Sequence, residues 1–165
     1  MAYLTNCNTF YEMAEESYSA MELALKGSRS ISADGKTMTE DGAKRNFASK
    51  QALIVIAFSA MHFEALVFIV AHQKLGMSAA QRLDRKLYEE RLVALGCTNQ
   101  SLIDQAKNLR EMRKEMVHEK AIDLGSKPDL NSMNIRIAWD AAYQAISFIR
   151  ELRSRLLGVS PPGIE

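Results

Sequence analysis

The chain has 165 residues, of which 47% are hydrophobic and 25% are charged, and its formal net charge is +1. This length predicts one domain, residues 1–158, followed by a short tail, residues 159–165. The composition excludes a disordered or fibrous chain. The charge excludes a chain-wide basic surface, so a nucleic-acid site needs a local basic cluster. The two cysteines fit no metal-ligand spacing, which predicts reduced thiols, a cytoplasmic location and no metal or other cofactor.

The first predicted helix runs from about Asn6 to Lys26. Apolar and small residues recur there at helical spacing, and Gly27 suits the end of a helix. The next segment, from Ser28 to Asp41, mixes Ser, Gly, Asp and Thr without periodicity and predicts a mobile loop. Because no basic stretch is followed by an apolar run near residue 1, we expect no secretory signal.

A second, longer helix is predicted from residue 42 to about Leu75, before Gly76. From Ala52 to Ala71 this helix is apolar over about the length of a membrane span. However, His62 and Glu64 lie near the middle, where a charged side chain is costly in a bilayer, and aromatic belts are missing on both sides. These features predict a central helix that is buried by its neighbours, and no membrane partner.

Three more helices are predicted, from Ser78 to Leu95, from about Asn99 to His118 or Lys120, and from the capping residues 129–132 to Leu156. No segment favours a strand. Four long helices and one shorter helix, joined by modest loops, predict an all-α fold: an antiparallel four-helix bundle with one additional shorter helix.

One position interrupts the apolar stripe of the helix that follows Asn99. The inward residues recur at spacings of four and three, and position 113 of this series is an arginine. The apolar members are Leu102, Ala106, Leu109 and Met116. A buried guanidinium keeps its charge, so it needs a carboxylate, a carbonyl or a phosphate as its partner. Glu64, in the middle of the most apolar helix, is the predicted internal partner of Arg113.

His118 follows Arg113 by five residues, near the predicted end of the same helix. In a regular helix five residues turn a side chain by roughly 140°, so the two residues do not share a face. They converge if the helix loosens at His118, or if two copies meet across a two-fold axis. The alternative is purely structural: Arg113 pairs with Glu64, and His118 lies at a helix C-terminus, where a cation is favourable.

The segment LREMRKEMVHEKA, from Leu109 to Ala121, resembles the signature helix of HEPN domains. In that family an arginine is followed, after four to six residues, by a histidine within an apolar frame. Arg113 and His118, with four residues between them, match this spacing. The apolar segment from Leu53 to Ala71, which carries Glu64, resembles the second helix of the family.

The resemblance implies a helical bundle that pairs into a homodimer. Many relatives are metal-independent endoribonucleases of toxin–antitoxin, anti-phage or RNA-processing systems, so the implied partners are RNA and an antitoxin or other protein. His118 would act as general base or acid at the ribose 2′-hydroxyl, because its pKa lies near neutrality. Arg113 would hold the scissile phosphate and stabilise its developing charge. The expected products carry a 2′,3′-cyclic phosphate and a 5′-hydroxyl.

The sequence departs from the family pattern at two positions. Lys114 stands where active relatives commonly have a small polar residue, often Asn, and Lys120 stands where some toxins have a regulatory Tyr. The alternative is therefore a non-catalytic HEPN-like module that binds RNA, a nucleotide or a partner protein. A third hypothesis, independent of the family, is a helical adaptor whose apolar surface binds another chain.

Basic residues gather on one side of the Arg113 helix. Lys107, Arg110 and Lys114 recur at spacings of three and four, and Lys120 follows near the predicted end. With Arg113 they predict a strip that follows an RNA backbone. The alternative is an ordinary solvated face, because acidic residues alternate with the basic ones at Glu111, Glu115 and Glu119. The helix has no aromatic residue for base stacking, so sequence-specific RNA recognition is not predicted.

Overall fold

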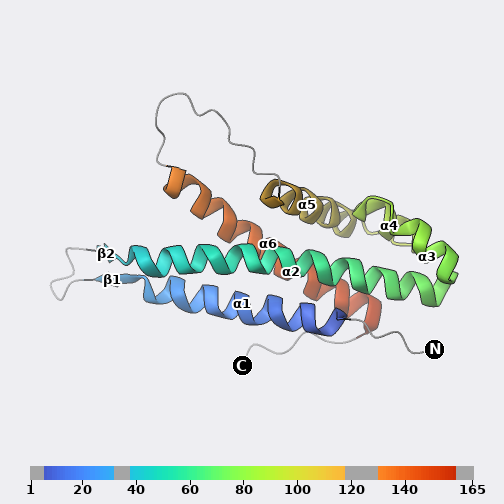
Figure 1. Cartoon of the computed structure of the whole chain (residues 1–165), viewed down its shortest axis with the longest axis horizontal. Coiled ribbons are helices and arrows are strands. Elements are labelled where there is room, and N and C mark those ends of the chain that lie inside the picture. Colours follow the sequence, from blue (N-terminus) through green and yellow to red (C-terminus); the bar gives the residue numbers. More distant parts are fainter. Residues whose placement is uncertain (1–5, 32–37, 118–129, 159–165) are drawn as a thin grey trace.

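A computed structural model of the chain describes residues 6–31, 38–117 and 130–158, without the side chains of 117 and 130–137. Within these ranges the protein is mostly helical, with six helices and one small two-stranded sheet (Figure 1). The long helices are α1 (Cys7–Gly27), α2 (Gly42–Leu75), α5 (Gln100–Val117) and α6 (Leu130–Leu157). The predicted all-α class is confirmed at this coarse level.

Two short paired strands lie between α1 and α2, so the prediction that no segment forms a strand is wrong; residues 32–37, in the middle of the predicted loop, lie outside the described residues. Strands β1 (Arg29–Ile31) and β2 (Met38–Glu40) pair antiparallel, and Ser30 lies opposite Thr39. The hydroxyl groups of that pair are 2.5 Å apart. Strands of three residues are too short to show an alternating pattern in the sequence, which is why they were not predicted.

Helix α2 begins and ends where the sequence predicts. The Asp41 carboxylate accepts hydrogen bonds from the backbone N–H groups of Ala43 at 3.0 Å and Lys44 at 3.2 Å, which caps the first turn. The Lys44 ammonium donates to the Gly27 carbonyl at 2.9 Å, which ties the start of α2 to the end of α1. At the other end, Gly76 has a φ of 84°, a backbone conformation that favours glycine.

The charged helix predicted from 78 to 95 is in fact two helices, α3 (Met77–Leu83) and α4 (Tyr88–Ala94). The buried Arg91 guanidinium donates to the carbonyl oxygens of Asp84 at 2.5 Å and Lys86 at 2.8 Å, which satisfies groups that the break leaves without helical partners. At the start of α4, Leu87 is 45% exposed, whereas Tyr88 is buried. The break therefore turns Tyr88 toward the core.

The core lies on one side of α2. Helix α2 contacts α1, α3, α5 and α6, and in Figure 1 it lies between α1 and α5 with α6 crossing behind it. The apolar stripe of α6 faces this core, with buried residues Ala142, Ile146, Ile149 and Leu152; the side chain of Ile135 lies outside the described residues. Among the described helices, α2 is long and apolar enough to cross a membrane, and half of its most apolar window is buried. Its predicted burial is thus confirmed on one side only.

Candidate functional site

Helix α5 positions the predicted site residues. The Asn99 side-chain oxygen accepts the backbone N–H of Leu102 at 3.2 Å, so the predicted cap is confirmed. The predicted inward stripe is buried as far as Leu109, which is fully enclosed. One turn later the side chain of Arg113 is 40% exposed. The prediction of which side of α5 faces inward is therefore confirmed, but Arg113 on that side is only partly buried.

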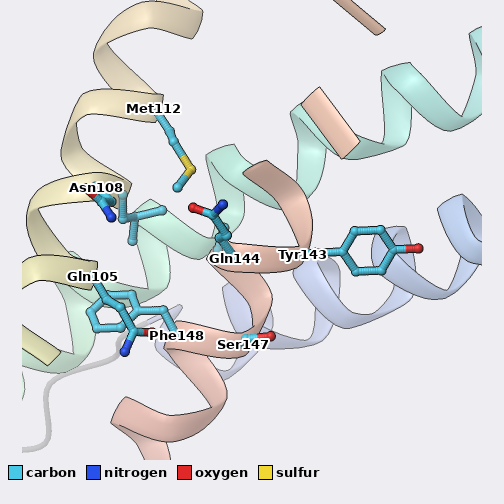
Figure 2. A pocket seen from close by; sticks show the side chains of 9 residues that line it. Gln105, Asn108, Met112, Tyr143, Gln144, Ser147 and Phe148 are labelled. Atoms are coloured by element: carbon cyan, nitrogen blue, oxygen red, sulfur yellow. The ribbon is translucent and has the colours of Figure 1, made fainter. Parts of the chain in front are cut away.

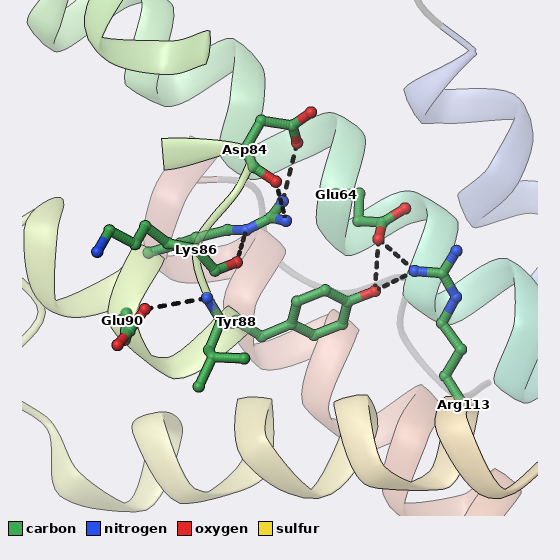
Figure 3. Close-up of polar contacts among 8 residues, drawn as sticks. Glu64, Asp84, Lys86, Tyr88, Glu90 and Arg113 are labelled. Atoms are coloured by element: carbon green, nitrogen blue, oxygen red, sulfur yellow. Dashed lines mark hydrogen bonds and ion pairs between the residues drawn. The ribbon is translucent and has the colours of Figure 1, made fainter. Parts of the chain in front are cut away.

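Three side chains from three helices meet at Arg113 (Figure 3). The Arg113 guanidinium reaches from α5 to α2, where Nη1 forms an ion pair with Oε1 of Glu64. The same Nη1 donates to the Tyr88 hydroxyl of α4 at 2.8 Å, and that hydroxyl donates to Oε1 of Glu64 at 2.8 Å. The predicted pairing of Arg113 with Glu64 is present. We call these three residues the Arg113 cluster.

Tyr88 was not among the predicted site residues. The Tyr88 ring stacks on Phe63 of α2, with ring centroids 4.4 Å apart, and Tyr88 is only 4% exposed. This packing directs the hydroxyl toward Glu64 (Figure 3). The position follows from the break between α3 and α4, which shifts the helical phase. Residues 84–87 contain no Gly or Pro, and leucines continue the apolar spacing across the break, so no sequence signal marks the position of Tyr88.

The electrostatics of the Arg113 cluster fix the proton on Tyr88. Burial, followed by the charge of Glu64, raises the pKa of Tyr88 well above its ordinary value. Burial by itself would lower the pKa of Arg113. The Tyr88 oxygen and the Glu64 carboxylate have a larger effect in the opposite direction, so the pKa of Arg113 is raised. At neutral pH Tyr88 is therefore a hydrogen-bond donor to Glu64, and it cannot serve as a base.

The Arg113 guanidinium has donors to spare. Its contacts with Glu64 and Tyr88 both use Nη1. Within the described part of the chain, Nη2 and Nε of Arg113 donate no hydrogen bond. A guanidinium presents five N–H donors in a planar fork that matches the oxygens of a phosphate or carboxylate. The cluster thus anchors one edge of Arg113 and leaves a partly exposed edge that can bind an anion.

The predicted basic strip is largely neutralised by acidic neighbours. Arg110 donates from Nη2 and Nε to both carboxylate oxygens of Glu89, at 2.8 Å and 3.1 Å, and forms an ion pair with Glu111 at 2.7 Å. These hydrogen bonds from Arg110 lower the pKa of Glu89. Lys114, 66% exposed, lies 3.9 Å from Glu111, whereas Lys107 is exposed and forms no ion pair with a described residue. The strip therefore has much less positive potential than its basic residues alone predict.

Two of the predicted site residues, His118 and Lys120, lie outside the described residues. Helix α5 is described as far as Val117, and His118 is the next residue in the sequence. The proposed convergence of Arg113 with His118 stays a prediction.

A shallow groove of about 390 Å³ lies between α5 and α6 (Figure 2). Its walls carry uncharged polar side chains, and its floor is apolar; the lining includes Gln105, Asn108, Met112, Gln144 and Phe148. No lining residue is charged, and Arg113 is not among them. The groove is thus separate from the Arg113 cluster and offers no positive charge to a phosphate.

Histidine and cysteine side chains form no metal site among the residues that the structure describes, where no group of three or more potential His, Cys, Asp or Glu ligands is found. His62 is fully buried, and its Nδ1 lies 2.8 Å from the carbonyl oxygen of Cys7. Burial lowers the pKa of His62, which keeps this imidazole neutral in the core.

Comparison with known proteins adds no family. No family model, no curated protein and no solved structure matches this chain. The functional assignment therefore depends on the sequence of the Arg113 helix and on the geometry of the Arg113 cluster.

Proposed function

We propose that this chain is a metal-independent endoribonuclease of the HEPN kind, which acts as a homodimer through Arg113 and His118. The observation that carries the proposal is the Arg113 guanidinium. It is held at Nη1 by Glu64 and Tyr88, while its remaining donors face outward near the end of α5. An arginine needed only for packing would direct its donors to internal acceptors.

The proposed chemistry needs one positive group and one residue that exchanges a proton near neutral pH. His118 removes the proton from the ribose 2′-hydroxyl, and the 2′-oxygen attacks the phosphorus. The bond from phosphorus to the 5′-oxygen breaks, and that oxygen takes a proton from a protonated His118 and leaves as a 5′-hydroxyl. The other product ends in a 2′,3′-cyclic phosphate. Arg113 stabilises the charge that develops on the phosphate oxygens.

The finer fold belongs to the same proposal. We assign α1, α2, α5 and α6 to an antiparallel four-helix bundle of the HEPN kind, with α3 and α4 in the place of the additional shorter helix. The packing of α2 against α1, α5 and α6 supports this arrangement. A cytoplasmic location, an antitoxin or other partner protein, and a role in toxin–antitoxin or anti-phage defence follow from the proposed family.

The alternative is a non-catalytic module with the same fold that binds RNA, a nucleotide or a protein. Two observations favour it. Lys114 stands where active relatives commonly have a small polar residue. The Arg110 side chain is also occupied by Glu89 and Glu111, so it is not free to follow an RNA backbone. Under this alternative Arg113 still binds a phosphate, but no bond is cleaved.

The test is RNA cleavage in EDTA by the purified full chain, with single-stranded RNA and tRNA as substrates. We expect fragments that end in a 2′,3′-cyclic phosphate, and we expect His118→Ala to abolish them. Thermal unfolding checks that His118→Ala is folded, and Arg85→Gln, an exposed substitution away from the cluster, controls for the loss of one positive charge. RNA binding without cleavage would favour the non-catalytic module. If RNA is neither bound nor cleaved, the helical adaptor takes the place of both.

A further inference from the structure

Helix α2 has an open apolar face. The side of α2 toward α6 is buried, and half of the most apolar window is not. In Figure 1 no described element lies over α2 on the side opposite α6. None of the following residues on that face is fully buried, and Phe47 is 47% exposed: Phe47, Ile54, Ala57, Met61, Ala65 and Phe68. An apolar surface of this length is typical of a binding interface.

The spacing on this face favours another helix as the occupant. Its large apolar residues, Phe47, Ile54, Met61 and Phe68, recur every seven residues. Seven residues return a side chain to nearly the same side of a helix, so a row with this spacing packs along a second helix. Phe47 and Phe68 are separated by 21 positions, or about 32 Å at a rise of roughly 1.5 Å per residue.

The charges on this stretch identify the partner. Between Phe47 and Phe68 the only charged residues are Lys50 and Glu64, and Ala57 lies midway between them, seven residues from each. We propose that a second copy of this chain covers the open face of α2 with its own α2, running antiparallel and crossing at Ala57. In that arrangement Lys50 of each copy faces Glu64 of the other, and two small alanines allow close approach at the crossing.

Other arrangements of the two helices fit the same charges less well. A parallel copy would place Lys50 against its own equivalent and Glu64 against its own, which costs energy. A bilayer would have to cover the Glu64 carboxylate and the Arg113 guanidinium at the edge of the face, where both are partly exposed. Only the antiparallel copy pairs both charges and covers the apolar row.

The two charged groups are available for this pairing. In the Arg113 cluster both contacts of Glu64 use Oε1, and no described residue donates a hydrogen bond to its Oε2. Figure 3 shows the second oxygen pointing away from Arg113 and Tyr88. Lys50 is exposed and forms no ion pair within the described ranges. An interfacial ion pair therefore forms without breaking any contact seen in the single chain.

The antiparallel pairing also provides the second copy that the proposed composite site requires, and this step rests on the proposed function. The C-terminal end of α5 lies beside the middle of α2 in Figure 1. A two-fold axis at Ala57, perpendicular to α2, brings the α5 ends of both copies to the same edge of the dimer. The described C-terminal ends of the two α5 helices would then border one shared cleft.

Sedimentation of the full chain over a range of concentrations tests the pairing. We expect a dimer whose dissociation constant rises at least about tenfold in Ala57→Arg, because two like charges then meet at the axis, and rises less in Lys50→Glu. Leu23→Arg, on the 74% exposed Leu23 of α1, is the matched control and should leave the dimer intact. A wild-type monomer at every concentration, or a dimer that Ala57→Arg does not weaken, would overturn the proposal.

Cysteine crosslinking tests the direction of the helices. Under mild oxidation Ala57→Cys should form a disulfide-linked dimer, whereas Phe68→Cys should not, since its two copies lie far from the axis. The wild type controls for Cys7 and Cys97. Equal crosslinking of both variants would show a parallel pair and contradict the proposal. Binding of a monomeric wild type to phosphatidylcholine vesicles would also contradict it.

RNA cleavage by the same proteins separates this proposal from the proposed function. A dimer that does not cleave RNA contradicts only the proposed function, and an Ala57→Arg monomer that cleaves RNA contradicts only the shared cleft.

Discussion

Two arginine–glutamate pairs join long helices of this protein, and they use the guanidinium differently. Arg150 of α6 donates from Nε and Nη2 to the two oxygens of Glu15 of α1, at 2.8 Å and 2.6 Å. Arg113 of α5 instead directs one nitrogen at one oxygen of Glu64. The Arg150 side chain is 26% exposed and the Arg113 side chain is 40% exposed. The first pair is bidentate and uses both oxygens of Glu15, whereas the second uses one nitrogen of Arg113 and one oxygen of Glu64.

This difference separates a packing role from a binding role. The face of the Arg150 guanidinium also lies over the ring of Tyr18, 5.0 Å from its centroid, which adds a cation–π contact to the ion pair with Glu15. Tyr88 occupies the corresponding place beside Arg113, but it contacts the same nitrogen that Glu64 uses. The four predictions below test whether the two arginines differ in this way, from the largest effect to the smallest.

The largest effect is expected from Arg113→Gln. The variant loses the guanidinium that stabilises the phosphate, so RNA cleavage should fall by roughly 100- to 1,000-fold, as when one transition-state donor is removed. Initial rates in EDTA measure this change, and thermal unfolding shows whether the fold is kept. Arg150→Gln, assayed at a temperature at which it is folded, should cleave RNA like the wild type. Equal losses of cleavage in both variants would show that the two arginines do not differ in function.

Arg150→Gln should be the more destabilising of the two substitutions. It removes two charge-assisted hydrogen bonds between α1 and α6, and we expect a loss of about 1–3 kcal/mol in the free energy of unfolding. Arg113→Gln should cost less than about 1 kcal/mol, because solvent screens its more exposed pair. Urea unfolding measures both values. A reversed order would mean that Arg113, and not Arg150, is the structural arginine.

Tyr88→Phe sharpens the comparison within the Arg113 cluster. The phenylalanine ring can keep its stacking on Phe63, but the hydroxyl between Arg113 and Glu64 is lost. We expect RNA binding to weaken by roughly threefold to tenfold, the value of about one hydrogen bond, as measured by fluorescence anisotropy in EDTA. Tyr18→Phe is the matched control beside Arg150 and should leave RNA binding unchanged. If both variants bind RNA equally well, Tyr88 does not position Arg113.

The smallest effect is a dependence on pH that belongs to the Arg150 pair. Burial by itself would raise the pKa of Glu15. Hydrogen bonds from Arg150 and Tyr11 have the larger effect, so the pKa of Glu15 lies below its ordinary value of 4.5. The unfolded chain therefore binds a proton at higher pH than the folded chain does. The stability that this pair provides is complete above about pH 4.5 and is lost as the pH falls through the lowered pKa. Urea unfolding between pH 3 and 6 should show this loss in the wild type and less of it in Glu15→Gln; equal slopes would contradict it.

Local patterns in the sequence predict the Arg113–Glu64 pair because each partner is exceptional in its own helix. Position 113 falls in the phase of Leu102 and Leu109, and Glu64 is the single acidic residue between Ala52 and Ala71. Helical spacing therefore places Arg113 on the inward stripe, and composition alone marks Glu64 as its partner. The same reasoning correctly predicts the ends of α2, where Asp41 and Gly76 act on the backbone directly.

The remaining features depend on contacts between distant parts of the chain. Tyr88 enters the Arg113 cluster because Arg91 stabilises a break in the helix, and leucines hide that break in the sequence. Arg150 and Glu15 are 135 residues apart, and no local pattern relates them. The basic strip was overestimated because the partner of Arg110, Glu89, lies on another helix. Pairings of this kind are set by how helices pack, which periodicity does not specify.

The most direct test of the difference between the two arginines is a titration followed by NMR. Single-stranded RNA is added in EDTA to a catalytically inactive His118→Ala chain, and the Nε–H signals of the arginine side chains are recorded. We expect the Arg113 signal to shift as RNA binds, while the Arg150 signal stays in place. An unchanged Arg113 signal at saturating RNA, or equal shifts for both arginines, would contradict the claim that Arg113 is the open, phosphate-binding arginine of this protein.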